Sequence, residues 1–431
     1  MKRRHQVVLF AVLLLSLTIL SPSFDFRGTP LNPEKKQEED SFPGSSSRNE
    51  EQQAPVEIVV SMSSEDFKPF QEIAKQVAEL QHVEIQLRNV EPDTYKQVLN
   101  QEFALGEGGD VILMDNAEVQ HYAKRGNLYP LNGTSLAKSA GDTVLRFRKS
   151  AEWNGYQWAM PFDFDAYVVV SRPFLINKAG LDSPLLTAEQ WNAFVKGRGA
   201  SSQEKLLGLD ASDPFAISAW LNQIHPKLVP TRMNPANWAE PNKEEREALQ
   251  LLNTMPKYVA AFDGNETSAT AANPDQLPMV VTSLAQWKKG SEASKKGGGI
   301  LGSQDSKASV TLAGLAMVHS RSFVITAGSS VSEHASKWIE GMTSVIIQAE
   351  WSSRTGRMPA RQEQLDAEME MLENQFKLTN GETWGKGESM HEIGESQLHD
   401  YSTSMEQLFR GKLKAEQYVK RILEIHANGS E

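Results

Sequence analysis

The chain has 431 residues, of which 39% are hydrophobic and 23% charged, and its formal net charge is −11. This length exceeds one ordinary domain core and predicts two or three domains, while the acidic balance is the opposite of what a nucleic-acid-binding protein usually shows. The absence of cysteine excludes disulfides, thiolate nucleophiles, cysteine-based metal sites and a lipid-modified cysteine after a signal sequence.

The N-terminus has the pattern of an export signal. Three basic residues at positions 2–4 precede an apolar run over 7–20, which has the length of a signal h-region and is short for a membrane span. Residues 1–24 are therefore predicted to be a signal peptide or an uncleaved anchor. Residues 25–54 are rich in Pro, Ser, Glu, Gln and Lys and poor in aliphatic residues. Because such a segment cannot bury enough surface to offset its ordering entropy, we expect a disordered tether.

The first half of the folded part alternates strands and helices. Apolar runs at 56–60, 83–87 and 111–114 predict strands, and periodic apolar positions predict helices over 65–80 and 95–103. This alternation favours an α/β fold with a parallel sheet covered by helices on both faces. Ligands of such sheets sit beyond the carboxyl ends of the strands.

Polar residues lie at two of those strand ends. Ser61 and Ser63 follow the first strand, and Asp115 ends the third. A serine there could donate a hydrogen bond to a ligand hydroxyl, although turn chemistry explains both serines equally well. Asp115 could meet a ligand, or it could cap the helix that follows.

Two aspartates follow a further strand that leads into Met160 and Pro161. Asp163 and Asp165 are two residues apart, so an extended backbone would put both carboxylates on one side. Paired carboxylates also hydrolyse glycosides, but there they face each other across the scissile bond, which neighbours on one strand cannot do. Ligand binding is the hypothesis for both residues, and a solvated or hinge-forming aspartate is the alternative. A strand over 167–170 and a helix ending at Gly180 come next.

The rest of the chain is mostly helical. Two apolar runs, 277–282 and 311–318, predict strands. Between them, residues 288–309 are polar and glycine-rich, which indicates a loop or an exposed hairpin. The predicted helices are 187–195, which starts with a capping box of Thr187 and Gln190, then 214–224, 243–252, 332–351 and a helix pair over 405–426 that breaks at Gly411.

The chain carries no motif of a known catalytic or cofactor site. His391 and Glu392 begin like the zinc motif H-E-x-x-H, but the second histidine is missing and Gly394 interrupts the helix. No G-x-S-x-G, P-loop or dinucleotide-binding fingerprint is present. We therefore expect no catalytic residue, no cofactor and no metal.

Six segments, in this order, resemble those of the extracellular solute-binding proteins of ABC importers, specifically the carbohydrate-binding, maltose-binding-protein-like group. The most recognisable is 350–361, which ends in the family's Thr-Gly-x-x-Pro-Ala-Arg pattern. The chain departs from the family's Gly-Pro-Trp-Ala turn, where it has Ser-Leu-Ala-Gln at 283–286 and Trp287 two places later. The six segments are 108–132, 154–182, 277–287, 313–317, 350–361 and 409–416.

This resemblance implies an α/β protein of two lobes, the periplasmic-binding-protein-like fold, in which three interlobe crossing segments join the lobes and the ligand lies between them. Such proteins close by a hinge around their ligand. The implied first lobe consists of 55–162 and 319–353, the second of 167–312 and 361–431, and the crossings of 163–166, 313–318 and 354–360.

The resemblance also implies a function. The chain is expected to be a monomeric, non-enzymatic receptor that binds a carbohydrate, of oligosaccharide size, and delivers it to the transmembrane subunits of an ABC permease. It would act outside the cytoplasm, either anchored to the outer face of the membrane or secreted. The alternatives are the same fold binding a polyamine, peptide or metal chelate, a partner of a sensor kinase, and a surface glycosidase.

Candidate ligand contacts follow from the resemblance and from residue chemistry. Asp165 matches the family's ligand-contact turn, and Trp287 is the stacking candidate by position. Aromatic faces pack on the C–H faces of sugars, so Trp158, Trp220 and Trp351 are further candidates, with a place in the core as the alternative for each. Arg357, in the third crossing, could bind a ligand hydroxyl or carboxylate with its planar guanidinium.

Overall fold

The computed structural model describes residues 54–181, 183, 186–197, 204–230, 233, 238–263, 277–295, 309–312, 318–375 and 395–428, which belong to one compact unit. The predicted signal or anchor segment and all but the last residue of the predicted tether lie outside these ranges. Across the described ranges, no helix is both long enough and apolar enough to cross a membrane.

The first sheet has six strands in the order β13-β6-β12-β3-β1-β2. Its strand β1 is parallel to β2 and β3, whereas β12 is antiparallel to β3 and β6, and β13 is antiparallel to β6. The strands are β1 (Val56–Val60), β2 (Ile85–Asn89), β3 (Val111–Asp115), β6 (Met160–Phe164), β12 (Ser320–Ile325) and β13 (Met358–Pro359).

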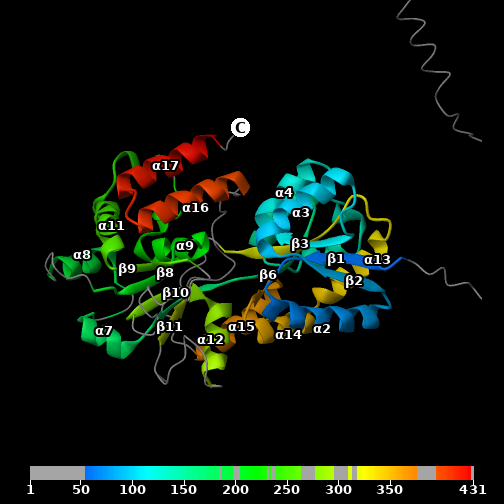
Figure 1. Cartoon of the computed structure of the whole chain (residues 1–431), viewed down its shortest axis with the longest axis horizontal. Helices are drawn as coiled ribbons and strands as arrows, with labels where there is room; N and C mark the ends of the chain where they lie inside the picture. The colour runs from blue at the N-terminus through cyan, green and yellow to red at the C-terminus, as the bar shows by residue number, and fades with distance from the viewer. Residues whose placement is uncertain are drawn as a thin grey trace, which may run out of the picture. The chain divides into compact units, whose positions relative to one another are not determined.

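Helices pack on both faces of this sheet because its central strands are apolar on both sides (Figure 1). One face, including Ile58 and Phe323, packs against α2 (Ser64–Gln81), α13 (Ser332–Met342) and α14 (Val345–Thr355). The other face, including Ile112 and Val324, packs against α3 (Pro92–Leu105) and α4 (Asn116–Lys124). Shorter elements complete this part: α5 (Leu136–Ala140), α6 (Leu145–Ser150), β4 (Glu152–Trp153), β5 (Tyr156–Gln157) and a 3-10 turn at Leu131–Gly133.

The second sheet has five strands in the order β11-β7-β10-β8-β9. Its strands are β7 (Tyr167–Ser171), β8 (Leu207–Asp210), β9 (Val259–Phe262), β10 (Met279–Ser283) and β11 (Ser309–Leu312). A large apolar cluster joins one face to helices gathered above it in Figure 1. The helices of this part are α7 (Pro173–Ala179), α8 (Ala188–Gly197), α9 (Pro214–Ile224), α11 (Lys243–Thr254), α12 (Leu284–Lys295), α16 (Glu395–Phe409) and α17 (Ala415–Asn428), with 3-10 turns at Pro226–Leu228 and Met255–Lys257.

The chain crosses between the sheets where strand β6 ends. Only Asp165 and Ala166 separate β6 from β7. The return from β11 to β12 includes residues 313–317, which lie outside the described residues. After β13, helix α15 (Gln362–Gln375) packs on β13 and α14, and its Leu365 shares a cluster with Val168 of β7.

The third crossing depends on a glycine. Gly356 ends α14 with φ +77°, a left-handed conformation that favours glycine. A β-carbon added there would lie 2.9 Å from the Cα of Ala285 on α12. Helix α12 also contacts α2 through an ion pair of 2.5 Å between Lys289 Nζ and Asp66 Oδ1. Helix α12, which follows a strand of the second sheet, thus packs closely on the first-sheet side.

Most expected elements are present, and two expectations are wrong. The segment 288–309 was expected to be a loop or hairpin, but its first part is helical, since α12 starts where Ser283 Oγ accepts from the Gln286 amide and extends to Lys295. Residues 296–308 lie outside the described residues. The expected single helix over 332–351 is two helices that break at Thr343. The capping box of Thr187 and Gln190 is confirmed at 3.2 and 2.9 Å.

Candidate functional site

Asp163 is the centre of a buried charge network at the crossing. Its side chain is fully buried on β6, and it accepts from Arg321 Nε at 3.0 Å and from Trp351 Nε1 at 2.7 Å. The second Arg321 contact and one with Arg357 Nε measure 2.5 and 2.9 Å. We call Asp163, Arg321, Arg357 and Trp351 the buried network; it joins β6, β12, α14 and the third crossing.

Ionisation holds this network together. Burial alone would raise the pKa of Asp163, but Arg321 and Arg357 lie so close that its pKa stays far below the usual range. Burial likewise opposes the charge of Arg357. The carboxylates of Asp163 and Asp165 outweigh this effect, so the pKa of the guanidinium is raised. The charges are therefore permanent at any ordinary pH, and the Asp163 carboxylate has no exposed surface to offer a ligand.

Asp165 stands one step outside the network. Its Oδ2 accepts from Arg357 NH1 at 2.6 Å, and its amide donates to the His319 carbonyl at 2.8 Å. Its Oδ1 has no hydrogen-bond partner within the described part of the chain. Arg357 therefore orients this carboxylate through Oδ2, while Oδ1 can still accept a hydrogen bond. A buried oxygen without a partner is costly, so a donor that reached Oδ1 would be stabilised there.

A second group at the crossing is partly exposed. His319 Nε2 lies 2.6 Å from Asp115 Oδ1, and the two side chains are 31% and 43% exposed. The His319 ring also packs on Phe215 of α9, with ring centroids 5.5 Å apart. We call Asp115, His319 and Phe215 the crossing clasp. Asp115 makes no side-chain cap to α4, so pairing with His319 replaces the capping role that was its alternative.

The carboxylates around the clasp have shifted pKa values. Burial opposes the charge of both partners, yet their attraction lowers the pKa of Asp115 and raises that of His319. Burial and the nearby Asp115 raise the pKa of Glu118 to about 7. Burial raises the pKa of Asp213 to about 6, although the Tyr167 hydroxyl donates to it at 2.7 Å. Acidic groups therefore crowd this end of both sheets.

Aromatic rings from the second sheet's side complete the group. Phe215 is partly buried and stacks on Tyr167 of β7, with centroids 6.4 Å apart. Asp213 caps α9 by accepting from the amides of Phe215 and Ala216 at 2.9 and 3.2 Å, which fixes the start of that helix. An aromatic surface and several hydrogen-bonding groups thus lie together at the crossing.

Four of the predicted site residues lie together at the crossing, and the two predicted serines do not. Asp115, Asp163, Asp165 and Arg357 come together at the crossing. Ser63 instead caps α2, because its Oγ accepts from the Asp66 amide at 3.3 Å and donates to Asp66 Oδ2 at 3.2 Å. Ser61 is partly buried between β1 and α2.

None of the four candidate tryptophans joins the clasp. Trp220 is buried in the second sheet's core beside Trp191, and Trp351 is buried as part of the network. Trp158 donates to the Trp153 carbonyl and precedes β6, at the end of that strand away from the crossing. Trp287 lies partly buried on α12, against an apolar cluster. Trp191 and Trp338 are also buried in the cores of the two sheets.

Sequence reasoning missed Phe215, His319, Arg321 and Asp213. The pattern Asp-Pro-Phe at 213–215 signals a capped helix start, and it follows a strand of the second sheet, so it could have been noticed. Strand β12, which carries Arg321, was not among the predicted strands. Nothing local in the sequence indicates that Arg321 pairs with Asp163, which lies 158 positions earlier.

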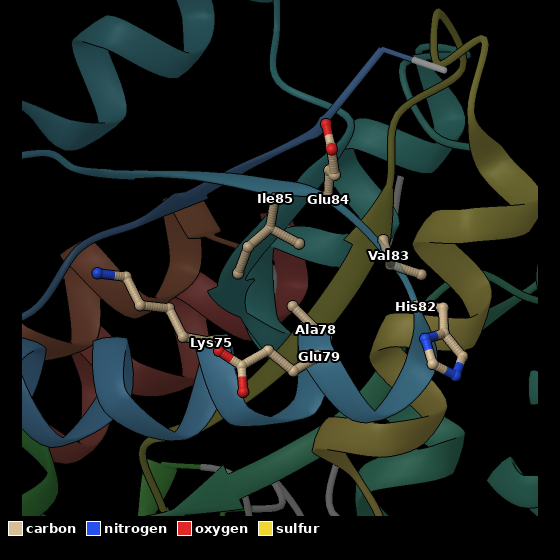
Figure 2. A pocket seen from close by; sticks show the side chains of 7 residues that line it. All are labelled: Lys75, Ala78, Glu79, His82, Val83, Glu84 and Ile85. Atoms are coloured by element: carbon tan, nitrogen blue, oxygen red, sulfur yellow. The ribbon is translucent and has the colours of Figure 1, made fainter. Parts of the chain in front are cut away.

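A hollow of about 400 Å³ lies elsewhere, at the end of α2 (Figure 2). Its lining residues come from α2 and the start of β2, and none belongs to the network or the clasp: Lys75, Ala78, Glu79, His82, Val83, Glu84 and Ile85. Within the described ranges no group of three or more His, Cys, Asp or Glu side chains is arranged to hold a metal ion. The rejected zinc-like motif at His391 lies outside the described residues.

Comparisons with solved structures show the fold. The GacH receptor of Streptomyces glaucescens, solved unliganded and with acarbose, matches with a TM-score of 0.64 and 16% identity over 87% of this chain and 98% of that one. The sugar-binding protein MalE of Xanthomonas citri matches with a TM-score of 0.60 and 14% identity over 88% of this chain and 98% of that one. Protein Lmo0181 of Listeria monocytogenes, solved in complex with cycloalternan, matches with a TM-score of 0.59 and 15% identity over 87% of this chain and 99% of that one. All are two-lobe binding proteins, so the expected two-lobe fold is confirmed.

A search of curated proteins finds no match to the sequence. The model of one family, described as bacterial extracellular solute-binding protein, matches residues 72–376, well over half of the chain. The match spans β3, both aspartates of the first crossing, β12 and the third crossing, so it includes every segment that builds the network and the clasp. The chain belongs to the family of bacterial extracellular solute-binding proteins.

Proposed function

We propose that this chain is the extracytoplasmic receptor of an ABC importer and that it binds a carbohydrate, of oligosaccharide size, at the crossing between its two lobes. The family assignment supports an exported binding protein. The solved structures that share the fold include complexes with acarbose, cycloalternan, tagatose and maltotetraose, which supports a sugar as the first ligand to test. Delivery to permease subunits as a monomer belongs to the same proposal.

The observation that carries this proposal is the pairing of a partly buried ring with partly satisfied acceptors. Phe215 offers an aromatic surface on which a sugar ring can pack. Asp165 Oδ1 and the half-exposed Asp115 are carboxylate acceptors for sugar hydroxyls. Arg357 acts on the ligand through Asp165, which it orients, while Asp163 fixes Arg357 in turn. The three crossings would form the hinge.

A cationic solute such as a polyamine is the second candidate. Glu118, near Asp115, and Asp213, near Asp210, have raised pKa values, and a ligand cation would favour the ionised form of both. A hydrolase receives no comparable support, since Asp163 is buried and paired with two arginines. The same proposal includes residues 1–24, either as an anchor to the outer face of the membrane or as a signal peptide that is removed from a secreted protein.

A thermal-shift screen tests this assignment. A ligand that binds only the native state raises the melting temperature in proportion to RT ln(1 + [L]/Kd). The screen would use acarbose, maltotetraose, cycloalternan and tagatose, with spermidine and a short peptide as the alternatives. We expect a shift with at least one sugar; a shift with spermidine alone would keep the fold and overturn the carbohydrate assignment.

Phe215→Ala then tests where the sugar binds. Removing a ring from a stacked contact costs about 0.5–1.5 kcal/mol beyond the area it buries, so we expect Kd to rise by about tenfold or more. Phe174→Ala is the matched control, because Phe174 on α7 is 71% exposed and is not part of the clasp. Equal affinity of the two variants would place the sugar away from Phe215.

A further inference from the structure

His319 contacts elements that belong to both sheets. Its Nε2 bonds to Asp115 at the end of β3, in the first sheet, and its ring packs on Phe215 of α9, which covers the second. Its carbonyl accepts from the Asp165 amide at 2.8 Å and from Arg357 NH2 at 3.4 Å. If one sheet moves relative to the other, His319 therefore has to move as well, or one of these contacts has to break.

The contact with Asp115 depends on a proton. A protonated imidazole donates to the carboxylate as a charge-assisted bond, roughly twice as strong as the bond from a neutral ring. Histidine is the side chain whose ordinary pKa lies where a modest change of pH alters its charge. Both partners are partly exposed, so solvent can exchange that proton without unfolding the crossing.

Several charged groups face His319. Asp115 on β3 stabilises its charged form, whereas Arg321 on β12 and Arg357 in the third crossing oppose it, and burial opposes it most. Glu118 on α4 interacts with both His319 and Asp115. On balance the pKa of His319 is raised. In the buried network, by contrast, the aspartate and the arginines keep their charges, so of these two groups the clasp is the one whose charge changes with pH.

We propose that Asp115, His319 and Phe215 form a proton-sensitive clasp that ties the first sheet to the second. With His319 protonated, the bond to Asp115 holds the ring beneath Phe215 and restricts movement of the lobes. Loss of the proton weakens that bond and allows the lobes a wider range of relative positions. The clasp regulates the site proposed above, because Asp115 is one of the acceptors proposed for the ligand.

Pulsed electron paramagnetic resonance on the ligand-free protein tests the clasp. The chain has no cysteine, so Leu80→Cys on α2 and Phe174→Cys on α7, at side chains 66% and 71% exposed, give two unique labelling sites. Distances would be measured at about pH 5.5 and about pH 8.5, on either side of the ordinary histidine pKa. We expect a narrow distribution at the lower pH and a broader one at the higher pH.

Two variants assign this response to His319. His319→Phe keeps a ring against Phe215 and removes the bond to Asp115, so its distribution should be broad at both pH values. His334→Gln on α13, outside the clasp, should respond as the wild type does. A wild-type distribution that is the same at both pH values would overturn the proposal. A response that persists in His319→Phe would also overturn it, because Glu118 or Asp213 would then be the titrating group.

An NMR titration gives an independent readout that does not depend on lobe movement. The His319 imidazole in the folded protein should titrate above the ordinary histidine value, and Asp115→Asn should lower its midpoint, because the neighbouring anion is gone. An unchanged midpoint would show that the two side chains do not interact in solution. Because neither measurement uses a ligand, the clasp can fail while the carbohydrate assignment stands, and the reverse.

Discussion

The buried network and the crossing clasp are neighbours on the paired strands β3, β12 and β6, but they use charge differently. In the network, Asp163 is fully buried and two arginines and an indole share its carboxylate. In the clasp, Asp115 and His319 are partly exposed and pair with each other. A saturated, buried charge can only hold segments together, whereas a partly exposed one can exchange its partner for water, a proton or a ligand. The comparison separates the structural part of the crossing from its responsive part.

Neutralising Asp163 should have the largest effect on stability. Asp163→Asn removes the anion shared by Arg321 and Arg357 and leaves buried positive charge uncompensated. Breaking a buried pair in this way costs about 3–5 kcal/mol, which urea unfolding would measure. A loss below about 1 kcal/mol, the range of exposed ion pairs, would show that Asp163 is not the structural centre of the crossing.

Removing the hydrogen bond from Trp351 to Asp163 should have a smaller effect on stability. Trp351→Phe keeps a ring in the core and removes the Nε1–H that donates to Asp163. Hydrogen bonds to charged groups contribute about 1.5–3 kcal/mol, so we expect a loss of stability of about that size. Trp338→Phe is the matched control, since that buried indole donates to the neutral Ala74 carbonyl at 3.2 Å. Equal losses in the two variants would mean that the charge of Asp163 adds nothing to the bond.

The pH dependence of stability reports the responsive part. His319, Glu118 and Asp213 have raised pKa values in the folded protein, to about 7 for Glu118 and about 6 for Asp213. Between their unfolded and folded pKa values the native state binds more protons than the unfolded state, so stability falls as pH rises. The lowered pKa values of Asp163 and Asp115 act in the opposite sense, with stability lost only as pH falls below about 4.

We therefore expect the melting temperature to fall between about pH 5 and about pH 8. The free energy of unfolding should fall by on the order of 1–2 kcal/mol over this range, because one pKa unit corresponds to 1.36 kcal/mol and solvent screens these partly exposed groups. Glu118→Gln should flatten the curve. Calorimetry across this range would measure both, and a stability that rises with pH would contradict the assigned shifts.

The smallest effect concerns Ser63. Its hydroxyl caps α2, so Ser63→Ala should lower stability by about 1 kcal/mol and leave ligand affinity unchanged. Thermal unfolding and a binding titration on the same variant would measure the two quantities. A large loss of affinity with little loss of stability would return Ser63 to the ligand contacts first expected of it.

Local patterns in the sequence predicted much of the fold. Apolar runs identified β1 and β3, and the helix predicted over 214–224 is α9 with its observed bounds. These features depend on neighbours a few residues apart, and so do the strand ends where Asp115 and Asp165 lie. The network and the clasp depend instead on contacts between residues about 100 to 200 positions apart. No local period encodes such pairing, which is why Arg321, His319 and Phe215 became visible only in the structure.

The central claim, that a sugar binds at the crossing, is tested most directly by calorimetric titration of the sugars of the thermal-shift screen into the wild type and Asp165→Asn. Asparagine keeps the shape of the side chain but removes the negative charge of a carboxylate whose Oδ2 pairs with Arg357 and whose Oδ1 has no partner in the described part of the chain. Hydrogen bonds to charged groups contribute about 1.5–3 kcal/mol, so Kd should rise by roughly tenfold to a hundredfold. Binding of a sugar with equal affinity to both proteins would contradict the account.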